Sequence, residues 1–354
     1  MTIAASAASS LSADRIAAYL RRRMPAAEDV AVAGLYRIPG GASRETWSFD
    51  ATWRDASGEH VQGLILRRDP DAGLLETQRD IEYAVYRAFA GSAVPVPRVY
   101  WLELDAEPLD RPFFVMERID GCQTDGSLLA MRPDDAGRRR IARRKFEILG
   151  AIHAADPAAL DLLGIDPSGP PPPEQCAERQ LCHWEAIIDA QQLEPVPVAR
   201  LAIAWLRHHP PPPAQRVVVC HGDYRSGNFL YAQDEIRGIL DWEMVHLGDP
   251  LEDLAWTSLI DWRYGAAPGQ RSELLGGIAP RDEAYATYSA ASGIRVDEAA
   301  LHWWEVFSHV KAIGIWITGG RSFVDRRTNE PLMARIPRLL NALQENAILD
   351  LLGW

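Results

Sequence analysis

Residues 217–243 read VVVCHGDYRSGNFLYAQDEIRGILDWE, and this stretch decides the fold of the chain. Its opening run of valines, 217–219, predicts a short strand, because β-branched side chains favour strands. The strand leads to Asp223, and a glycine-containing loop then reaches Asn228. An acid and an amide are therefore expected in one loop at the end of a strand.

Two short segments, 229–231 and 236–240, predict the strands of a hairpin, and Asp241 follows the second of them. Two acids and one amide are thus expected at strand ends or in the loop between strands. Phosphoryl transfer of the protein-kinase type needs this set of groups. One acid orients a hydroxyl and accepts its proton, while an amide and a second acid hold Mg²⁺. Asp223 is the candidate base, and Asn228 and Asp241 are the candidate metal ligands.

The composition excludes several other classes of protein. A chain of 354 residues with 47% hydrophobic and 24% charged residues is long enough for two lobes with their own cores. Its net charge of -12 argues against a nucleic-acid partner. No apolar run approaches the ~20 residues of a membrane span, and the N-terminal residues do not resemble a secretory signal. The four cysteines have no framework spacing, so we expect a reduced, cytoplasmic protein.

Glycines lie between two strands predicted near the N-terminus, 30–36 and 46–53. Gly40, Gly41 and Ser43 could place backbone N–H groups against phosphates. A simple hairpin turn is the favoured interpretation of this segment when it is taken alone. Its position ahead of the next strand raises the odds of a phosphate-covering turn.

A basic residue and an acid follow in the order that an ATP cleft requires. The strand predicted at 63–68 carries Arg67, which alternation places on the same face as Ile65. The helix predicted at 74–90 carries Glu82 on its apolar stripe, where a carboxylate needs a cationic partner. We expect Arg67 to be that partner. Periodicity alone allows equally that Glu82 lies at the edge of an amphipathic helix.

Strands dominate before residue 120 and helices after it. Strands are predicted at 99–104 and 113–117, and helices at 12–24, 138–155, 174–191, 198–208, 281–291, 297–318 and 331–352. The resulting prediction is an α+β chain with two lobes. The first lobe, 1–119, is predicted to bind nucleotide and to consist of an antiparallel sheet with a helix. The second lobe, 120–354, is larger and mostly helical, and it is predicted to be catalytic and to bind the substrate.

The motifs HGDYRSGN, ILDWE and GDPLEDLAW occur in this order, and together they resemble the aminoglycoside phosphotransferase and choline kinase superfamily. The overall pattern is also similar to the kinase-like domains associated with acyl-CoA dehydrogenases. The resemblance implies a bilobal protein-kinase-like fold over nearly the whole chain. It also implies ATP and Mg²⁺ as cofactors.

The resemblance implies a role for each polar residue of the second lobe. Asp223 would be the catalytic base that positions the acceptor hydroxyl, and Asn228 and Asp241 would hold the Mg²⁺ that bridges the ATP phosphates. His221 would be the structural histidine of the loop. Asp253 would be the buried acid that holds the loop in place.

The resemblance also assigns residues of the first lobe. The turn of Gly40, Gly41 and Ser43 would cover the phosphates. Linker residues Glu117 and Ile119 would bind adenine through their backbone, with Met116 behind the pocket.

Arg67 departs from the family pattern, in which the third strand usually provides a lysine paired with a helix glutamate. Arginine keeps the charge but is longer and planar, so the exchange is not neutral. We expect Arg67 to pair with Glu82 and still to touch phosphate.

These observations predict an ATP- and Mg²⁺-dependent small-molecule kinase, acting as a monomer or homodimer. A catalytically weak, nucleotide-binding regulatory protein is the alternative, and the Arg67 departure gives it some weight. A metal-dependent hydrolase that uses Asp223, His221 and Asp241 fits less well, because it leaves Asn228 unexplained.

The sequence leaves the hydroxylated substrate open among aminoglycosides, amino alcohols, hydroxy acids and acyl-CoA compounds, and it does not distinguish ATP from GTP. A polycationic substrate favours an acid-lined pocket. From Asp261 to the end, however, acidic and basic residues nearly balance. Aromatic side chains such as Trp303, Trp304 and Phe307 are most often core residues. If some of them lined the pocket, a partly apolar or anionic substrate would fit better.

Overall fold

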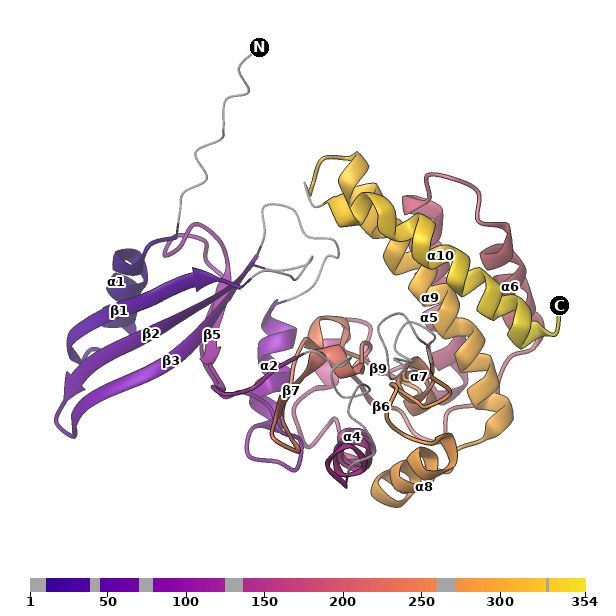
Figure 1. Ribbon diagram of the computed structural model, residues 1–354, viewed down its shortest axis with the longest axis horizontal. Coiled ribbons are helices and arrows are strands. Elements are labelled where there is room, and N and C mark those ends of the chain that lie inside the picture. Colours follow the sequence, from indigo (N-terminus) through magenta and orange to yellow (C-terminus); the bar gives the residue numbers. More distant parts are fainter. Residues whose placement is uncertain (1–10, 39–44, 70–78, 125–135, 260–271, 329–330) are drawn as a thin grey trace, which may run out of the picture. The chain divides into compact units, whose positions relative to one another are not determined.

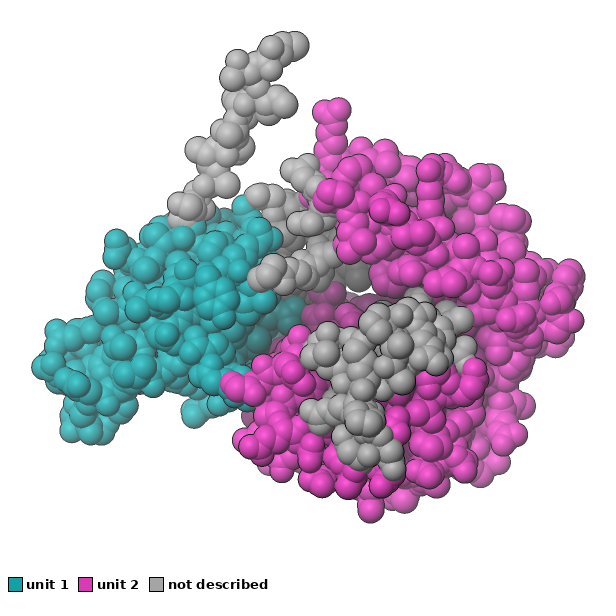
Figure 2. Space-filling view, viewed as in Figure 1, with its two compact units in different colours: residues 1–83, 97–120 teal, residues 84–96, 121–354 magenta. Residues whose placement is uncertain are grey.

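The computed structural model describes residues 11–38, 45–69, 79–124, 136–259, 272–328 and 331–354. The chain divides into two compact units, coloured separately in Figure 2. The first comprises Met1–Tyr83 and Pro97–Asp120, and the second comprises Ala84–Val96 and Gly121–Trp354. The lobe boundary predicted after residue 119 places 84–96 in the first lobe, whereas their contacts place them in the second unit.

The first unit is built on a five-stranded antiparallel sheet in the order β1-β2-β3-β5-β4. The strands are β1 (Glu28–Arg37), β2 (Glu45–Asp55), β3 (Gly58–Arg68), β4 (Val99–Glu103) and β5 (Phe113–Glu117). Strand β3 begins at Gly58, earlier than the predicted residue 63. Its first half is largely exposed, so it lacks the buried apolar residues on which the prediction relied.

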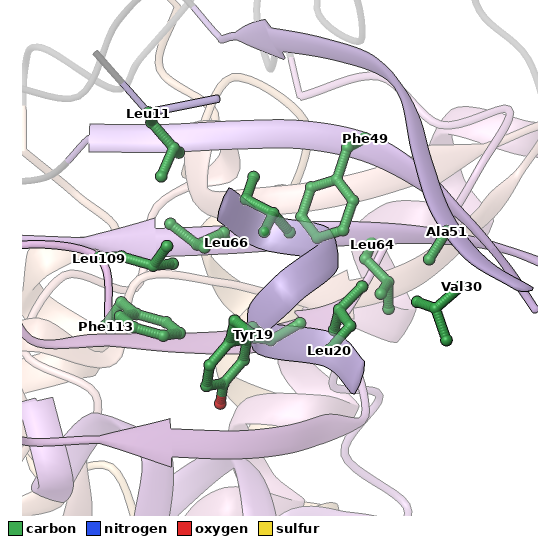
Figure 3. Packing of buried hydrophobic residues seen from close by; sticks show 12 residues of the cluster. Leu11, Tyr19, Leu20, Val30, Phe49, Ala51, Leu64, Leu66, Leu109 and Phe113 are labelled. Atoms are coloured by element: carbon green, nitrogen blue, oxygen red, sulfur yellow. The ribbon is translucent and has the colours of Figure 1, made fainter. Parts of the chain in front are cut away.

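Helix α1 (Ala13–Arg23) packs on this sheet, as Figure 3 shows from close by. It begins where predicted, because the side-chain oxygen of Ser12 accepts a hydrogen bond from the N–H of Arg15 at 3.3 Å. Its apolar face shares one core with side chains from three strands and a loop: Ile16, Tyr19 and Leu20 meet Phe49, Leu64, Leu66, Leu109 and Phe113. Helix α2 (Arg79–Phe89) starts in the first unit and ends in the second.

The second unit is mostly helical. Its helices are α4 (Ala136–Ala154), α5 (Cys176–Gln191), α6 (Pro197–His208), α7 (Pro250–Trp256), α8 (Arg281–Ser292), α9 (Glu298–Val324) and α10 (Pro331–Leu352). Helix α10 packs along α9, and α4 packs on α8 (Figure 1). No helix in the described parts of the chain has the length and apolar character needed to cross a membrane.

Two small antiparallel pairs of strands support the 217–243 stretch. Strands β7 (Phe229–Ala232) and β8 (Glu235–Ile239) form the predicted hairpin. Strand β6 (Val218–Cys220) pairs with β9 (His246–Gly248), a segment that is not among the strands predicted from the sequence. Three residues are too few to display strand alternation, so the sequence alone gave no indication of β9.

Candidate active site

Strand β6 is fully buried and delivers the 221–228 loop to the end of the β6–β9 pair. Gly222 has a φ of +81°, and a Cβ at this position would lie 2.3 Å from the carbonyl oxygen of Met244. Only glycine satisfies both conditions, because a side chain would be strained and would also meet backbone. The turn that presents Asp223 therefore depends on Gly222.

The carboxylate of Asp223 is held by three donors. Its Oδ1 accepts the indole N–H of Trp256 at 2.8 Å. Its Oδ2 accepts from Nδ2 of Asn228 at 2.8 Å and from Nε of Arg225 at 3.1 Å. These three hydrogen bonds restrict the rotation of the carboxylate, as a base that orients a hydroxyl requires.

Asn228 is oriented by the same contacts. Its Nδ2 also donates to the backbone carbonyl of Asp223 at 3.0 Å, so the amide nitrogen is used within the loop. The amide oxygen is then the atom that Asn228 can offer to a hard cation.

Asp241 follows β8 in a left-handed conformation, with φ 69° and ψ 55°. Few residues other than glycine adopt this region, and those that do cluster at functional sites. The N–H of Asp241 donates to the hydroxyl of Tyr86 at 3.0 Å. The preceding residue, Leu240, donates its N–H to the carbonyl of Asn228 at 2.8 Å. The bond of Leu240 places the adjacent Asp241 near Asn228, although the hairpin β7–β8 lies between the two residues in the sequence.

A magnesium ion fits this pair of residues. Asn228 and Asp241 offer oxygen donors of the kind that Mg²⁺ prefers, and Mg²⁺ usually takes only one or two protein carboxylates together with substrate phosphates and water. Within the described ranges no cluster of three or more His, Cys, Asp or Glu could hold a metal ion. Asn228 and Asp241 could hold such an ion together with the phosphates of a nucleotide.

His221 fastens the loop to the hairpin as a neutral imidazole. Its Nδ1 accepts the N–H of Asp223 at 3.2 Å, so the proton lies on Nε2, which donates to the carbonyl of Leu240 at 3.0 Å. Burial lowers the pKa of His221, which agrees with the neutral form. His221 contacts the backbone on both sides of the site.

Asp253, in helix α7, binds the start of the loop. Its carboxylate accepts the N–H groups of His221 and Gly222 at 2.6 and 2.8 Å, and Nε2 of His153 lies 3.2 Å from Oδ2. Burial alone would raise the pKa of Asp253, but its hydrogen bonds with His153 and with the backbone of His221 hold it at about 2. Asp253 is therefore ionised at neutral pH although it is fully buried.

A buried ion pair lies behind the loop. The ammonium of Lys311 donates to the carbonyl of Gly222 at 2.6 Å and to Glu252 at 2.9 Å. Nε2 of His246 lies 3.0 Å from the other oxygen of Glu252. Burial alone would raise the pKa of Glu252, but Lys311 and His246 lower it below its ordinary value. The carbonyl next to Asp223 is thus held by a charged donor.

Lys145, in α4, contacts the loop from another direction. Its ammonium is fully buried and lies 3.3 Å from the hydroxyl of Ser226 and 5.7 Å from the ring centre of Phe229. Burial lowers the pKa of Lys145 from 10.5 to about 7.

Lys145→Met is expected to stabilise the protein by about 1–3 kcal/mol near pH 6.5. A pKa lowered this far corresponds to roughly 5 kcal/mol of penalty on the charged amine, and the lost bond to Ser226 offsets part of the gain. The penalty is complete below the folded-state pKa of about 7 and fades as pH rises toward 10.5. Urea unfolding at pH 6.5 and pH 9 measures the difference. If the gain in the free energy of unfolding of Lys145→Met over the wild type is as large at pH 9 as at pH 6.5, this explanation is wrong.

In the first unit, Nη1 of Arg67 lies 3.1 Å from Oε1 of Glu82, with 8% and 0% of the two side chains exposed. The predicted pairing of Arg67 with Glu82 is therefore confirmed. Whether Arg67 touches phosphate stays a prediction. Gly40, Gly41 and Ser43 lie outside the described residues.

The predicted adenine linker is only partly available for binding. Met116 is buried at the end of β5. The N–H of Glu117 donates to the carbonyl of Arg98 at 2.8 Å, and the N–H of Arg118 donates to Gly63 at 3.0 Å. Both groups are used within the first unit. The half-buried Ile119 therefore carries the linker N–H that remains the candidate for adenine.

Sequence reasoning missed four residues that contact the 221–228 loop or lie within it: Trp256, Lys311, Lys145 and Arg225. Trp256 ends the motif GDPLEDLAW, one helical turn after Asp253, and this i, i+3 spacing places both on one face of α7. A second signal was available in the composition. The chain contains only two lysines, and both lie in predicted helices.

Comparisons with known proteins found a family model and curated relatives that match this chain. A family model described as the phosphotransferase enzyme family matches residues 35–293. Acyl-CoA dehydrogenase family member 10 of Mus musculus is 32% identical over 201 residues, covering 55% of this chain and 18% of that protein. The chain therefore spans about a fifth of the length of this relative.

Solved structures show the fold. A putative aminoglycoside phosphotransferase from Ralstonia eutropha is 22% identical, with a TM-score of 0.69 over 94% of this chain and 95% of that one. A thermostable mutant of the aminoglycoside phosphotransferase APH(4)-Ia, in complex with ADP and hygromycin B, is 18% identical, with a TM-score of 0.56 over 95% and 98% of the two chains. The predicted α+β, protein-kinase-like fold is confirmed.

Proposed function

This chain belongs to the phosphotransferase enzyme family, and from that premise we propose that it is an ATP- and Mg²⁺-dependent kinase of a small hydroxylated molecule. One observation carries the proposal: Asn228 donates to the carboxylate of Asp223, and Leu240, the neighbour of Asp241, donates to the carbonyl of Asn228, an arrangement that suits one base and two oxygen ligands. In this reaction the acceptor hydroxyl attacks the γ-phosphate, the bond from that phosphorus to the bridging oxygen of ADP breaks, and the hydroxyl proton passes to Asp223.

The protein's own contribution is positioning and charge. Asp223 orients the hydroxyl, and Asn228 and Asp241 would hold the Mg²⁺ that neutralises the phosphates. In the first unit, Arg67 is proposed to bind phosphate while Glu82 fixes its guanidinium. Ile119, beside Glu117, is proposed to offer its backbone to adenine.

We propose that the substrate is not a polycation. The near balance of charge after Asp261 supports this, and so do the acyl-CoA dehydrogenase names of the relatives, which favour a hydroxyl-bearing acyl-CoA. Three aromatic side chains give this proposal no support, because Trp303, Trp304 and Phe307 are buried in the core. ADP release measured over aminoglycosides, amino alcohols, nucleosides and hydroxyacyl-CoAs tests the proposal. A clear preference for aminoglycosides would overturn it.

Asp241→Asn is expected to weaken the binding of Mg·ATP at least about tenfold, while ATP in the presence of EDTA binds as it does to the wild type. Asparagine tolerates the left-handed backbone of this position, so the change removes charge without adding strain. Titration calorimetry measures both affinities. Glu235→Gln, at an exposed position of the same hairpin, is the matched control. Equal Mg·ATP affinities for Asp241→Asn and the wild type would remove Asp241 from the metal site.

The regulatory alternative has a distinct outcome. A nucleotide-binding protein without catalysis would bind ATP in the calorimeter and release no ADP with any hydroxylated compound of the screen. The hydrogen bonds that hold Asp223 and orient Asn228 favour the kinase, since binding alone does not require a positioned base.

A further inference from the structure

The chain contains two lysines, and every other residue among its 37 Lys and Arg is an arginine. Lys145 is fully buried and Lys311 is 1% exposed. Lysines are almost never this buried. Both also contact the same short segment, the 221–228 loop, from helices that are far apart in sequence. Their burial and their shared target call for a common explanation.

Lys311 supports the loop at two points next to Asp223. Its ammonium donates to the carbonyl of Gly222 at 2.6 Å, and it lies 4.9 Å from the ring centre of Trp256. Trp256 in turn donates its indole N–H to Oδ1 of Asp223 at 2.8 Å. One cation therefore fixes the backbone before Asp223 and the ring that holds the carboxylate of Asp223.

Lys145 supports the other half of the loop through Ser226. The space around its amine is closed: a Cβ added at Gly276 would lie 2.5 Å from Nζ and 3.2 Å from Oγ of Ser226. Within the described residues no carboxylate lies within ion-pair distance of this ammonium. Such an amine costs stability, so stabilisation of the fold does not explain its presence.

Lysine suits both places better than arginine does. Its ammonium is compact and directs three donors from one nitrogen, whereas a guanidinium is a planar fork that needs more room. Lys311 uses this geometry to reach Gly222 and Glu252 together. At Lys145 the closed space beside Gly276 leaves no room for a larger group.

We propose that Lys311 and Lys145 are positioning residues that hold the 221–228 loop from two sides, and that Lys311 acts on Asp223 through Gly222 and Trp256. The inference rests on the proposed function, because it is the kinase reaction that needs the Asp223 carboxylate in one orientation. Lys145 keeps Ser226, midway between Asp223 and Asn228, in its place.

Kinetic measurements distinguish a residue that positions Asp223 from one that only stabilises the fold. Trp256→Phe keeps an aromatic ring, although a smaller one, and removes the indole N–H; it is expected to lower kcat about 10- to 100-fold while the KM for ATP changes less than about twofold. Lys145→Met is expected to lower kcat about tenfold although the protein becomes more stable. Trp303→Phe is the control, because its buried indole N–H bonds to Leu206 in the helical core. A wild-type kcat in Trp256→Phe or in Lys145→Met would overturn the role of that residue.

Lys311→Met alone leaves the buried Glu252 with only His246 beside it, so a loss of stability would obscure the effect on kcat. The double variant Lys311→Met with Glu252→Gln avoids an unpaired charge. It is expected to lower kcat about tenfold at unchanged KM for ATP. Unchanged kcat in the folded double variant would show that Lys311 does not position Asp223.

A second measurement does not depend on activity. In protein labelled with ¹⁵N at the tryptophan indoles, the Trp256 signal is identified by its loss in Trp256→Phe. The NMR chemical shift of this indole N–H is expected to change in Asp223→Asn and in the Lys311 double variant. A signal that stays in place in both would overturn the proposal. If the wild type consumes no ATP with any alcohol, the proposed function fails, and the indole signal alone decides whether the loop is held as inferred.

Discussion

Asp223→Asn is expected to lower phosphoryl transfer by about 10³-fold or more while nucleotide still binds. Asparagine has the same shape but no basic oxygen, so the acceptor hydroxyl loses the group that orients it and takes its proton. Loss of a general base costs 10²–10⁴-fold. In the wild type the Asp223 carboxylate accepts from Trp256 on one side and from Asn228 and Arg225 on the other. The NH₂ group of an asparagine would face one of these sides, where it cannot accept a hydrogen bond. Misalignment of the loop therefore adds to the loss.

The measurement pairs ADP release with calorimetric ATP binding on the same preparation. Asp189→Asn is a suitable control, because Asp189 is exposed at the end of α5 and pairs only with a surface arginine in the described structure. It is expected to behave as the wild type in both assays. Normal ATP consumption by Asp223→Asn would sink the assignment of Asp223 as base. Loss of ATP binding in this variant would show instead that Asp223 supports the nucleotide site.

The closeness of the candidate site residues could be predicted from sequence because the hairpin makes them local. Asp223, Asn228 and Asp241 stand at strand ends whose spacing is readable, and the bond between Leu240 and Asn228 follows once β7 and β8 pair. The same reasoning placed Arg67 on a strand and Glu82 on the apolar stripe of a helix, and the two side chains form an ion pair with each other. Periodicity alone left open whether Glu82 would lie at the edge of its helix, and the buried ion pair with Arg67 settles that point.

The supports of the loop could not be predicted in this way. Lys311 reaches Gly222 across 89 positions of sequence, and Lys145 reaches Ser226 across 81. Helix α9 is buried on nearly every side over most of its length, so no polar stripe indicates where Lys311 points. Strand β9 was missed because three residues show no alternation. These features depend on tertiary packing, which motif spacing does not encode.

Asp249 and Asp253, two of the three acids at the start of helix α7, differ in their electrostatic environment, so the same substitution should affect them differently. Asp253→Asn is expected to destabilise the protein by about 3–5 kcal/mol. Asp253 accepts from the N–H groups of His221 and Gly222 and lies beside Nε2 of His153. An amide at this position turns one acceptor into a donor, so at least one buried N–H loses its partner.

Asp249→Asn is the matched control, because Asp249 is the buried N-cap of the same helix and its Oδ1 accepts the N–H of Leu251 at 2.8 Å. Asparagine caps helices as well as aspartate does. Burial raises the pKa of Asp249 to about 6, so its charge costs stability at neutral pH. Asp249→Asn is therefore expected to leave the free energy of unfolding unchanged or to raise it by about 1 kcal/mol.

The pH dependence of unfolding separates the two acids further. The pKa of Asp253 is lowered to about 2, so its stabilising contribution is complete above its ordinary pKa of 3.8 and is lost as pH falls toward 2. The free energy of unfolding that Asp253→Asn loses relative to the wild type, measured by urea unfolding, should therefore be constant from pH 5 to 7 and become smaller in stronger acid. A deficit below about 1 kcal/mol at pH 7, with Asp249→Asn equally affected, would mean that the hydrogen bonds of Asp253 do not hold the loop. If the deficit is as large as expected, the start of the 221–228 loop depends on one buried, ionised carboxylate.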